Sequence, residues 1–507
     1  MYDFSQKRLP SQKQDIALEV QELLKLYAAH PQVTALDTLL KNDTSRNIFL
    51  KGLNGSGPAM TIASLFTKGR GSYVCVLNDQ EEAGYFYHDL MQLTASNEVY
   101  FFPSAYRRAI KYGHVDPANE ILRTEVLSRL QDPDASFVIV TYPDALAERV
   151  VAREVLKENT LKISVGEKLD NMFVSDVLDE YGFEQVDYVY EPGQYALRGS
   201  ILDVFSFSYE FPYRIDFFGD EVETIRTFDV ETQLSKEKLD SIYIVPEMSK
   251  NAKDSTSLLG SLPPNTFIAA RDLAWCKERI GSVWNDDPVV ADEESFADID
   301  QMRKKLVQAE DFLREVLDFR RIHFGVRPMG TADATIHFST QTQPIYHKNF
   351  DRVSESFHKY LDEGYALYIL SDQEKQANRI RMIFEDRGDN IPFTAVNRTI
   401  HEGFADDTLR ICFFTDHQLF DRFHKFNLKS DKARSGKITL SLKELNQFSQ
   451  GDYIVHIDHG VGQFGGLVRT EVNGKMQEAI KLIYQNNDII FVSIHSLHKL
   501  SKYKGKE

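Results

Sequence analysis

The sequence has 507 residues, of which 42% are hydrophobic, and this length and composition predict three or four globular domains. The formal net charge of −17 excludes a chain that binds nucleic acid through its bulk charge, and it favours protein partners. Three widely spaced cysteines without a CxxC pair predict a reducing compartment and argue against a disulfide framework. The N-terminus has no apolar signal region and no apolar run could span a bilayer, so we expect a cytoplasmic protein without a membrane partner.

Strands and helices alternate through residues 1–155, which form the first predicted domain. The expected helices lie at 14–30, 59–66 and 116–130, and the expected strands at 47–52, 72–77, 99–102 and 137–141. This alternation is typical of an α/β protein with a doubly wound parallel sheet.

A glycine-rich turn after the first strand has the G-x-x-x-x-G spacing of a nucleotide-binding P-loop, with Gly52, Gly55 and Gly57. A working P-loop continues with Lys, which neutralises the β- and γ-phosphates, and with Ser or Thr, which ligates magnesium. Here those positions hold Pro58 and Ala59. We therefore predict the fold of a nucleotide site without its chemistry, and we find no other catalytic set in the sequence.

The segment 101–123 contains a group of basic and aromatic residues, namely Tyr106, Arg107, Arg108, Lys111 and Tyr112. Such a group could bind nucleic acid by stacking and charge. Because the whole chain is acidic, an ordinary solvated loop is the favoured interpretation.

Residues 156–248 form a second predicted domain, rich in strands and inserted into the first. Strands are expected at 200–207, 213–218 and 221–230, with a tight turn at Gly219-Asp220. The alternation in the second strand sends its odd-numbered residues to the core and sends Arg214 and Phe218 to the other face. Two interpretations stay open: a binding surface, or a purely structural pair in which Arg214 contacts Glu223 and Phe218 caps the sheet.

The α/β character returns over 249–330, with a strand at 266–270 and a long charged helix at 293–324. The acidic run Ala291–Ser295 fits the start of a helix better than a helicase box. Residues 331–428 predict a small α/β domain without an assignable motif. Expected there are helices at 354–363 and 372–386 and strands at 365–370, 393–396 and 409–415, and the segment 429–446 reads as a polar linker.

Residues 447–507 predict a small SH3- or Tudor-like β-barrel with strands at 452–457, 463–472, 475–484 and 489–494. Asn473-Gly474 is a hairpin signal, and glycines 460, 462, 465 and 466 fit turns and bulges. Five residues invite a metal interpretation, but they lack the spacing of a ligand set, and we predict no metal site: His456, Asp458, His459, His495 and His498.

The stretches ALRGSILDVF, PYRIDFFGDEVETIR and TFDVETQLS resemble the UvrA-interacting domain of the excinuclease subunit UvrB. They resemble even more closely its counterpart in the transcription-repair coupling factors (the Mfd family). The resemblance implies that Arg198, Arg214 and Phe218 contact UvrA. The degenerate P-loop agrees with the coupling factors and departs from UvrB. A second departure is the short 101–123 segment, where UvrB carries a long DNA-clamping hairpin.

The run Asp452–Leu467 is similar to the signature of RNA-polymerase-interacting domains in coupling factors and CarD-type regulators. In that family an edge strand adds to a sheet of the polymerase β subunit, a mode that uses main-chain hydrogen bonds for affinity. The implied contacts are Leu467, Val468, Arg469 and Thr470, although the family often has an apolar residue where Thr470 stands.

Together these resemblances imply a protein of transcription-coupled nucleotide excision repair that recognises stalled RNA polymerase and recruits UvrA. The family's ATP-driven translocase, which uses ATP and magnesium and holds double-stranded DNA, would follow residue 507, so we expect this chain to be an N-terminal fragment without a cofactor of its own. Two alternatives remain: a UvrB-like NTPase acting on damaged DNA, and a CarD-like transcription regulator.

Overall fold

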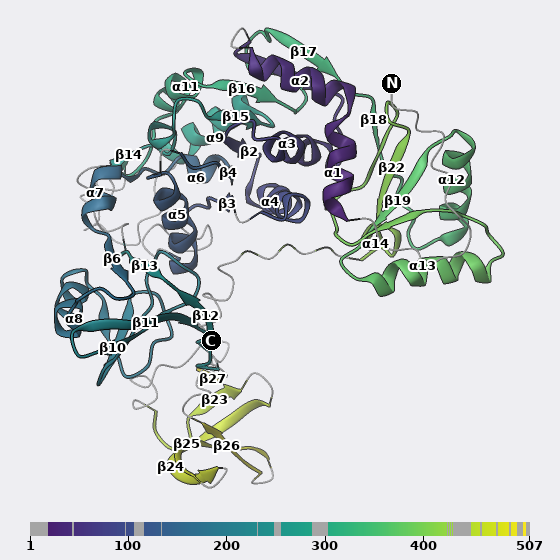
Figure 1. The fold of residues 1–507 in the computed structure, drawn as a ribbon. Coiled ribbons are helices and arrows are strands. Elements are labelled where there is room, and N and C mark those ends of the chain that lie inside the picture. Colours follow the sequence, from purple (N-terminus) through teal and green to yellow (C-terminus); the bar gives the residue numbers. More distant parts are fainter. Residues whose placement is uncertain are drawn as a thin grey trace. The chain divides into compact units, whose positions relative to one another are not determined.

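The computed structural model of the chain divides into two compact units (Figure 1). Unit 1 comprises residues 1–104, 132–149 and 257–427, and unit 2 comprises 105–131, 150–256 and 428–507. None of the helices in the described part of the chain is long and apolar enough to cross a membrane. The structure describes residues 19–502 except 43–44, 97, 106–115, 133, 231, 248–254, 286–302, 423, 425, 427, 429–447, 457–458, 473–474, 486–487 and 494–499.

Unit 1 contains a seven-stranded sheet in the order β17-β1-β16-β15-β2-β4-β3, and each neighbouring pair is parallel. Its strands are β1 Asn47–Lys51, β2 Tyr73–Val76, β3 Val99–Phe101, β4 Val138–Thr141, β15 Phe267–Ala270, β16 Arg320–His323 and β17 Ala334–His337. The accompanying helices are α1 Val20–Ala28, α2 Pro31–Lys41, α3 Gly57–Thr67, α4 Gln80–Thr94, α6 Pro143–Leu146, the 3-10 helix η2 Leu259–Ser261, α9 Leu273–Asn285 and α11 Ala309–Leu317. The predicted parallel sheet is confirmed.

The long charged helix predicted at 293–324 is wrong at its C-terminal end, where Arg320–His323 form strand β16 between β1 and β15. Charged residues are tolerated there because they bind the free carbonyl groups at helix ends. Arg320 donates to the carbonyls of Leu39 and Leu40 at the end of α2, and Arg321 donates to that of Leu317 at the end of α11. Helical periodicity cannot reveal such long-range partners.

A second, five-stranded sheet in unit 1 has the order β18-β21-β22-β19-β20. Its elements are β18 Thr340–Thr342, α12 Phe350–Asp362, β19 Ala366–Leu370, α13 Glu374–Asp386, β20 Thr394–Val396, β21 Phe404–Asp406, β22 Ile411–Thr415 and α14 Asp416–Leu419. The helices and strands predicted between 354 and 415 are thereby confirmed. Strand β17, which follows the predicted boundary at residue 331, belongs to the first sheet and pairs with β1.

Unit 2 contains a six-stranded sheet in the order β12-β11-β10-β9-β8-β7. One face packs on α8 and on the β6–β13 pair through a cluster that includes Val174, Ile215 and Ile242. Part of the other face packs on α5 through Ile121 and Phe205. The elements are α5 Pro117–Arg129, β5 Val150–Val151, α7 Arg153–Glu158, β6 Leu161–Ser164, α8 Asn171–Glu180, β7 Glu184–Gln185, β8 Gln194–Arg198, β9 Ile201–Val204, β10 Tyr213–Phe218, β11 Glu221–Phe228, β12 Ser235–Leu239, β13 Ser241–Ile244 and β14 Ser255–Thr256.

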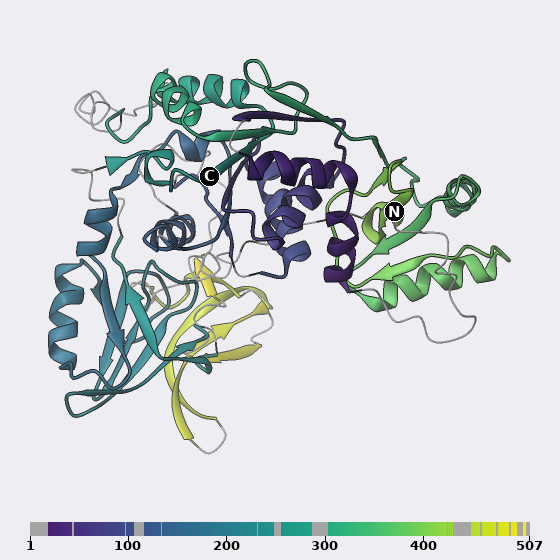
Figure 2. The same ribbon diagram turned by 45° about the horizontal axis from the view of Figure 1, so that its top comes forward.

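The C-terminal residues of unit 2 form a five-stranded antiparallel sheet in the order β26-β25-β24-β23-β27. Its strands are β23 Tyr453–His456, β24 Gly460–Val472, β25 Lys475–Ile483, β26 Ile489–Ser493 and β27 Leu500–Lys502. The two longest strands, β24 and β25, reach beyond their neighbours (Figure 2).

Several sequence predictions fall outside the described residues. They are the start of the first helix, the basic-aromatic group in 106–112, the acidic run at 291–295, the linker at 429–446, the turn Asn473-Gly474, and Asp458, His495 and His498. The predicted limits of the domains stay predictions.

Candidate functional site

The glycine-rich turn has the strand–loop–helix geometry that its spacing predicted. Strand β1 ends at Lys51 and helix α3 begins at Gly57, and Gly52 and Gly55 adopt positive φ angles of 89° and 53°. Pro58 and Ala59 lie buried in the first turn of α3, where the missing N–H of proline costs nothing. The turn is therefore a P-loop in shape, without the ammonium and hydroxyl groups that phosphate chemistry needs.

Backbone groups of other loops occupy this P-loop. The amide of Ser56 donates to the carbonyl of Glu402 at 3.0 Å, and the amide of Glu402 donates to the Ser56 hydroxyl at 3.0 Å. A Cβ atom at Gly55 would lie 2.9 Å from the carbonyl oxygen of Gly403. The amide of Asn54 donates to the Thr340 hydroxyl at 2.9 Å. Amides that could hold a phosphate are thus bonded to the protein itself.

A buried carboxylate, Asp89 on α4, completes this arrangement. Its Oδ2 accepts from the Ser56 hydroxyl at 2.5 Å, and its Oδ1 accepts from the amide of His401 at 2.7 Å. Burial raises the pKa of Asp89 to about 7, against the effect of the two donated hydrogen bonds. Asp89 therefore fastens the loop at 401–402 to the P-loop.

A pocket of about 470 Å³ lies beside the P-loop and is strongly acidic. Its charged lining residues are Asp79, Glu81, Glu82, Asp89, Glu402 and Arg271. Arg271 is paired with Glu82 at 2.8 Å. A triphosphate would meet several carboxylates and one arginine that is already paired, so the electrostatics of this pocket oppose nucleotide binding.

The two faces of strand β10 divide as the alternation predicted. Tyr213, Ile215 and Phe217 are buried in the core under the six-stranded sheet. Arg214 and Phe218 lie on the other face, and the Phe218 side chain is 79% exposed. Gly219 has a φ of 65°, as the predicted tight turn requires.

Arg198 and Arg214 converge on one carboxylate, Asp203 of β9, which is fully buried. Arg214 donates from Nε at 2.7 Å and from Nη2 at 2.8 Å, and Arg198 donates to Oδ2 from the neighbouring strand β8. Hydrogen bonding to Asp203 raises the pKa of Arg214. The alternative in which Arg214 contacts Glu223 is wrong, because strand β11 places Arg226 opposite Arg214, and Arg214 binds Asp203 of β9 instead.

The two guanidinium groups differ in exposure. The side chain of Arg214 is 16% exposed and lies over the ring of Phe228 at 4.3 Å, whereas that of Arg198 is 36% exposed and lies over the ring of Tyr188 at 5.0 Å. Arg198 also donates to the carbonyl of Asp187 at 2.7 Å. Arg214 is therefore mostly buried on an interior strand of the sheet, and Arg198 keeps part of its surface open to a partner.

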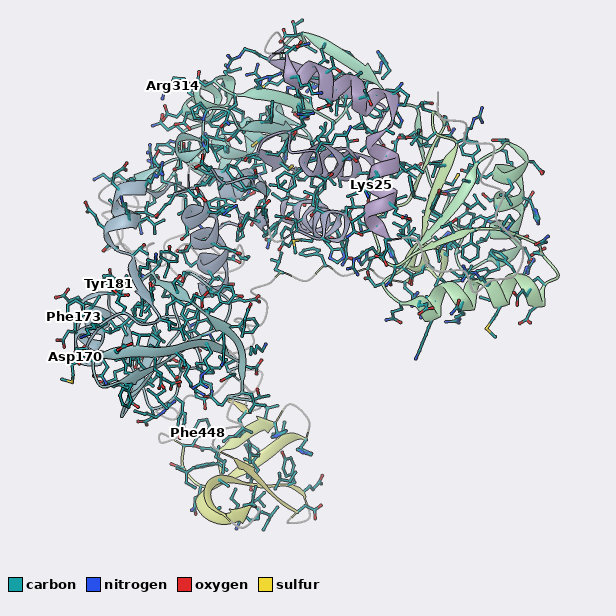
Figure 3. All side chains as sticks on the ribbon, in the orientation of Figure 1. Lys25, Asp170, Phe173, Tyr181, Arg314 and Phe448 are labelled. Carbon is teal, nitrogen blue, oxygen red and sulfur yellow. The ribbon has the colours of Figure 1, made fainter. Side chains whose placement is uncertain are left out.

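The segment that leads into α8 supports the turns next to these residues. The amide of Leu169 donates to the carbonyl of Asp220 at 2.7 Å, and Nδ2 of Asn171 donates to the carbonyl of Gly199 at 3.2 Å. Asp170 caps α8 by accepting from the amide of Met172, and Figure 3 shows Asp170 and Phe173 where this helix starts. This one segment therefore holds the backbone of both turns, next to Arg198 and next to Phe218.

In the C-terminal sheet, strand β24 has two parts separated by a bulge at Gly465-Gly466. The first part pairs with β23 over 460–463, and Gln463 and Phe464 also pair with β25. Among the described pairings, 467–472 joins only β25, which leaves the other edge of this part without a strand partner. Leu467 is exposed and Val468 half-buried, while the side chains of Arg469 and Thr470 lie outside the described residues. The predicted polymerase-binding segment is thus an edge.

Sequence reasoning missed Asp203 and the side chains around Asp89. A single Asp between apolar residues in the strand Ile201–Val204 was the available signal, because a carboxylate at a core position demands a partner. A third missed set is a group of three histidines, His401, His417 and His424, whose separation in the sequence matches no metal motif. Only the tertiary fold brings these residues together.

Two family models match the parts of unit 2 just described. The UvrB interaction domain matches residues 161–249, and the CarD-like/TRCF RID domain matches residues 448–504. The chain is similar to the transcription-repair-coupling factors. The transcription-repair-coupling factor of Staphylococcus aureus (strain bovine RF122 / ET3-1) is 23% identical over 562 residues, covering 94% of this chain and 47% of that protein.

The transcription-repair-coupling factor of Escherichia coli (strain K12) is 22% identical over 518 residues, covering 89% of this chain and 45% of that protein. The chain thus spans less than half the length of these coupling factors.

Proposed function

We propose that this chain is the adaptor part of a transcription-repair coupling factor, which recruits UvrA through Arg198, Arg214 and Phe218 and engages the RNA polymerase β subunit through 467–470. The exposed ring of Phe218, on a strand whose other side is buried, is the observation that carries the proposal. An exposed aromatic beside arginines has the composition of a binding hot spot. Whole-protein activity, an ATP- and magnesium-dependent translocase acting on double-stranded DNA, is part of the same proposal.

The three residues have different roles in the proposed binding of UvrA. Phe218 is the apolar anchor, and Arg198 has exposed surface for an acidic or carbonyl acceptor on UvrA. Arg214 acts mainly by holding Asp203 and the strand in place, because most of its side chain is buried. This division refines the sequence prediction, which gave Arg198 and Arg214 the same role beside Phe218 as the anchor.

The decisive experiment measures UvrA binding by the Phe218→Ala variant. Truncating a central anchor costs about 2–4 kcal/mol, so we expect affinity to fall about 30- to 1,000-fold. Because Phe218 is exposed, the free energy of unfolding should change by only about 0.5 kcal/mol. Leu234→Ala is the matched control, since Leu234 is also an exposed apolar residue of this domain, at 68%. Equal loss in both variants, or none in Phe218→Ala, would reject the assignment.

Polymerase binding is tested separately with Val468→Pro. Strand addition at an edge needs main-chain N–H groups, and proline removes one. Binding to polymerase should fall while binding to UvrA persists. Loss of both activities would indicate unfolding of the chain, and loss of neither would exclude this segment. The SH3- or Tudor-like character of the C-terminal sheet belongs to this proposal.

The two alternatives make different predictions in the same experiments. A UvrB-like NTPase would bind Mg-ATP, which the occupied amides of the P-loop and the acidic pocket argue against. A CarD-like regulator without a repair role would bind polymerase and ignore UvrA. A UvrA pull-down with the unmodified chain separates that regulator from the coupling factor.

A further inference from the structure

Four histidines of unit 1 meet beside helix α4, although they are far apart in the sequence. His401 precedes β21, His417 lies in α14, His424 follows α14, and His88 lies in α4. The ring centroids of His417 and His424 are 4.2 Å apart, those of His88 and His424 are 5.1 Å apart, and those of His401 and His424 are 5.8 Å apart. One ligand nitrogen from each of His401, His417 and His424 lies within 4.8 Å of the other two.

The hydrogen bonds of these rings leave nitrogen lone pairs unused. Nδ1 of His401, Nδ1 of His424 and Nε2 of His88 are buried, and none of them has a hydrogen-bond partner among the described residues. Nε2 of His417 lies 2.8 Å from the carbonyl oxygen of His401, so this nitrogen carries the proton and donates it. Nδ1 of His417 then has a free lone pair. A backbone carbonyl that orients the far nitrogen is the usual support of a metal-binding histidine.

Imidazole binds a metal ion in its neutral form. Burial lowers the pKa of His401 to about 4 and that of His417 to about 3. Burial also lowers the pKa of His424, although the nearby carboxylates of Asp372 and Asp416 oppose this shift. Without a metal, several buried nitrogens would remain unsatisfied, and each such atom destabilises the fold.

We propose that His401, His417 and His424 bind one divalent transition-metal ion of the zinc class. Imidazole ligands suit zinc, copper and nickel, and Zn–N bonds of about 2.0–2.1 Å place ligand nitrogens about 3.3 Å apart in a tetrahedral site. The rings therefore need to close on the ion by small side-chain rotations. His88 provides a further imidazole in contact with His424.

The ion would fasten the loop that fills the P-loop. His401 is the neighbour of Glu402, whose backbone is bonded to Ser56. The segment around His424 is held on α4, where the Tyr85 hydroxyl donates to the His424 carbonyl at 2.8 Å. A Cβ atom at Gly84 would lie 2.3 Å from the ring of Phe426, so this glycine makes room for the segment. A metal would therefore cross-link the loop at His401, helix α14 and the segment at His424.

The test uses the full chain without a histidine tag, stripped with a chelator and desalted. Zn²⁺ titration by calorimetry, with metal analysis of the recovered protein, should give one equivalent. Co²⁺ in its place should give the intense visible absorption of a tetrahedral site. In His424→Ala we expect the Zn²⁺ affinity to fall about 100-fold or more, because removing a ligand exceeds the 10- to 100-fold cost of removing a ligand's support. The exposed His358→Ala is the matched control and should bind like the parent.

His424→Ala should fold, because its ring nitrogen Nδ1 gives up no hydrogen bond, and circular dichroism checks this. His417→Ala provides a second, independent loss of one ligand. The proposal is overturned if the unmodified chain takes up no stoichiometric Zn²⁺, or if both variants bind it as the parent does. Weak octahedral Co²⁺ absorption by the unmodified chain would overturn it without any variant.

Discussion

Two buried carboxylates organise the two candidate sites, and their partners decide what each site can do. Asp89 in unit 1 accepts from a hydroxyl and from a backbone amide, both neutral and both inside the protein. Asp203 in unit 2 accepts from two guanidinium groups, of which Arg198 stays partly exposed. The first carboxylate closes a nucleotide-binding geometry by fastening a loop into it, and the second holds cationic side chains beside an open surface.

The difference teaches that a retained fold does not imply a retained site. The P-loop keeps its strand, glycines and helix, yet its Ser56 amide donates to Glu402, its Asn54 amide donates to Thr340, and its pocket is acidic. The six-stranded sheet carries no catalytic motif that we identify, yet the ends of its strands β10 and β8 present an aromatic ring and an arginine. What each site can bind therefore depends on whether its polar groups are bonded inside the protein or exposed to a partner.

The largest expected effect comes from Asp203→Ala. Removing this carboxylate leaves two arginines without their shared partner, and breaking a buried ion pair costs about 3–5 kcal/mol. Urea unfolding followed by circular dichroism should show a large loss of stability, and UvrA binding should disappear with it. A variant as stable as the parent would show that Asp203 is not the centre of this region.

Arg214→Ala and Arg198→Ala should separate in stability. Arg214 makes two hydrogen bonds to Asp203 and is mostly buried, so its loss should cost about 2–3 kcal/mol. Arg198 is more exposed, and its loss should cost about 1 kcal/mol or less. Thermal melts alongside UvrA affinities measure both quantities. If Arg198→Ala were the less stable variant, the division of roles proposed here would be reversed.

The raised pKa of Asp89 should be visible in the pH dependence of the free energy of unfolding. Its pKa is raised from the ordinary 3.8 to about 7 in the folded state, so its contribution is fully present below 3.8 and is lost as pH rises through about 7. Asp89→Asn, which cannot titrate, should flatten this decline while losing about 1 kcal/mol from one missing acceptor. Denaturant unfolding of both proteins across this pH window is the measurement. Parallel pH profiles would contradict the raised pKa.

The smallest expected effect is none at all. Pro58→Lys combined with Ala59→Thr restores the missing P-loop residues but leaves Ser56 bonded to Glu402. We expect no ATPase activity and no saturable Mg-ATP binding by calorimetry, in the parent or in the double variant. Stoichiometric binding by the parent would overturn the closed-site interpretation, and binding by the double variant alone would attribute the defect to the two residues.

The sequence predicted what depends on local pattern. Alternation in β10 placed Tyr213 inside and Phe218 outside, and the glycine spacing located the P-loop. The sequence could not predict contacts that join distant segments. Arg214 donates a hydrogen bond to Asp203 of the neighbouring strand, and the Ser56 hydroxyl accepts one from the amide of Glu402, 346 residues away in the sequence. Strand β16 was mistaken for helix because its arginines are satisfied by the ends of two helices.

The extra residue at Gly465-Gly466 has a geometric consequence for the free edge of β24. Phe464 pairs with Leu482 and Leu467 with Ile480, so three steps along β24 match two along β25. Side chains on both sides of the bulge keep their partners, while the strand bends and twists at this point. Deleting one glycine would preserve the pairing of Leu467 and straighten the strand. Such a deletion changes the direction of this edge but keeps its side chains. It therefore tests whether binding of a partner depends on the orientation of the strand or on the side chains that it carries.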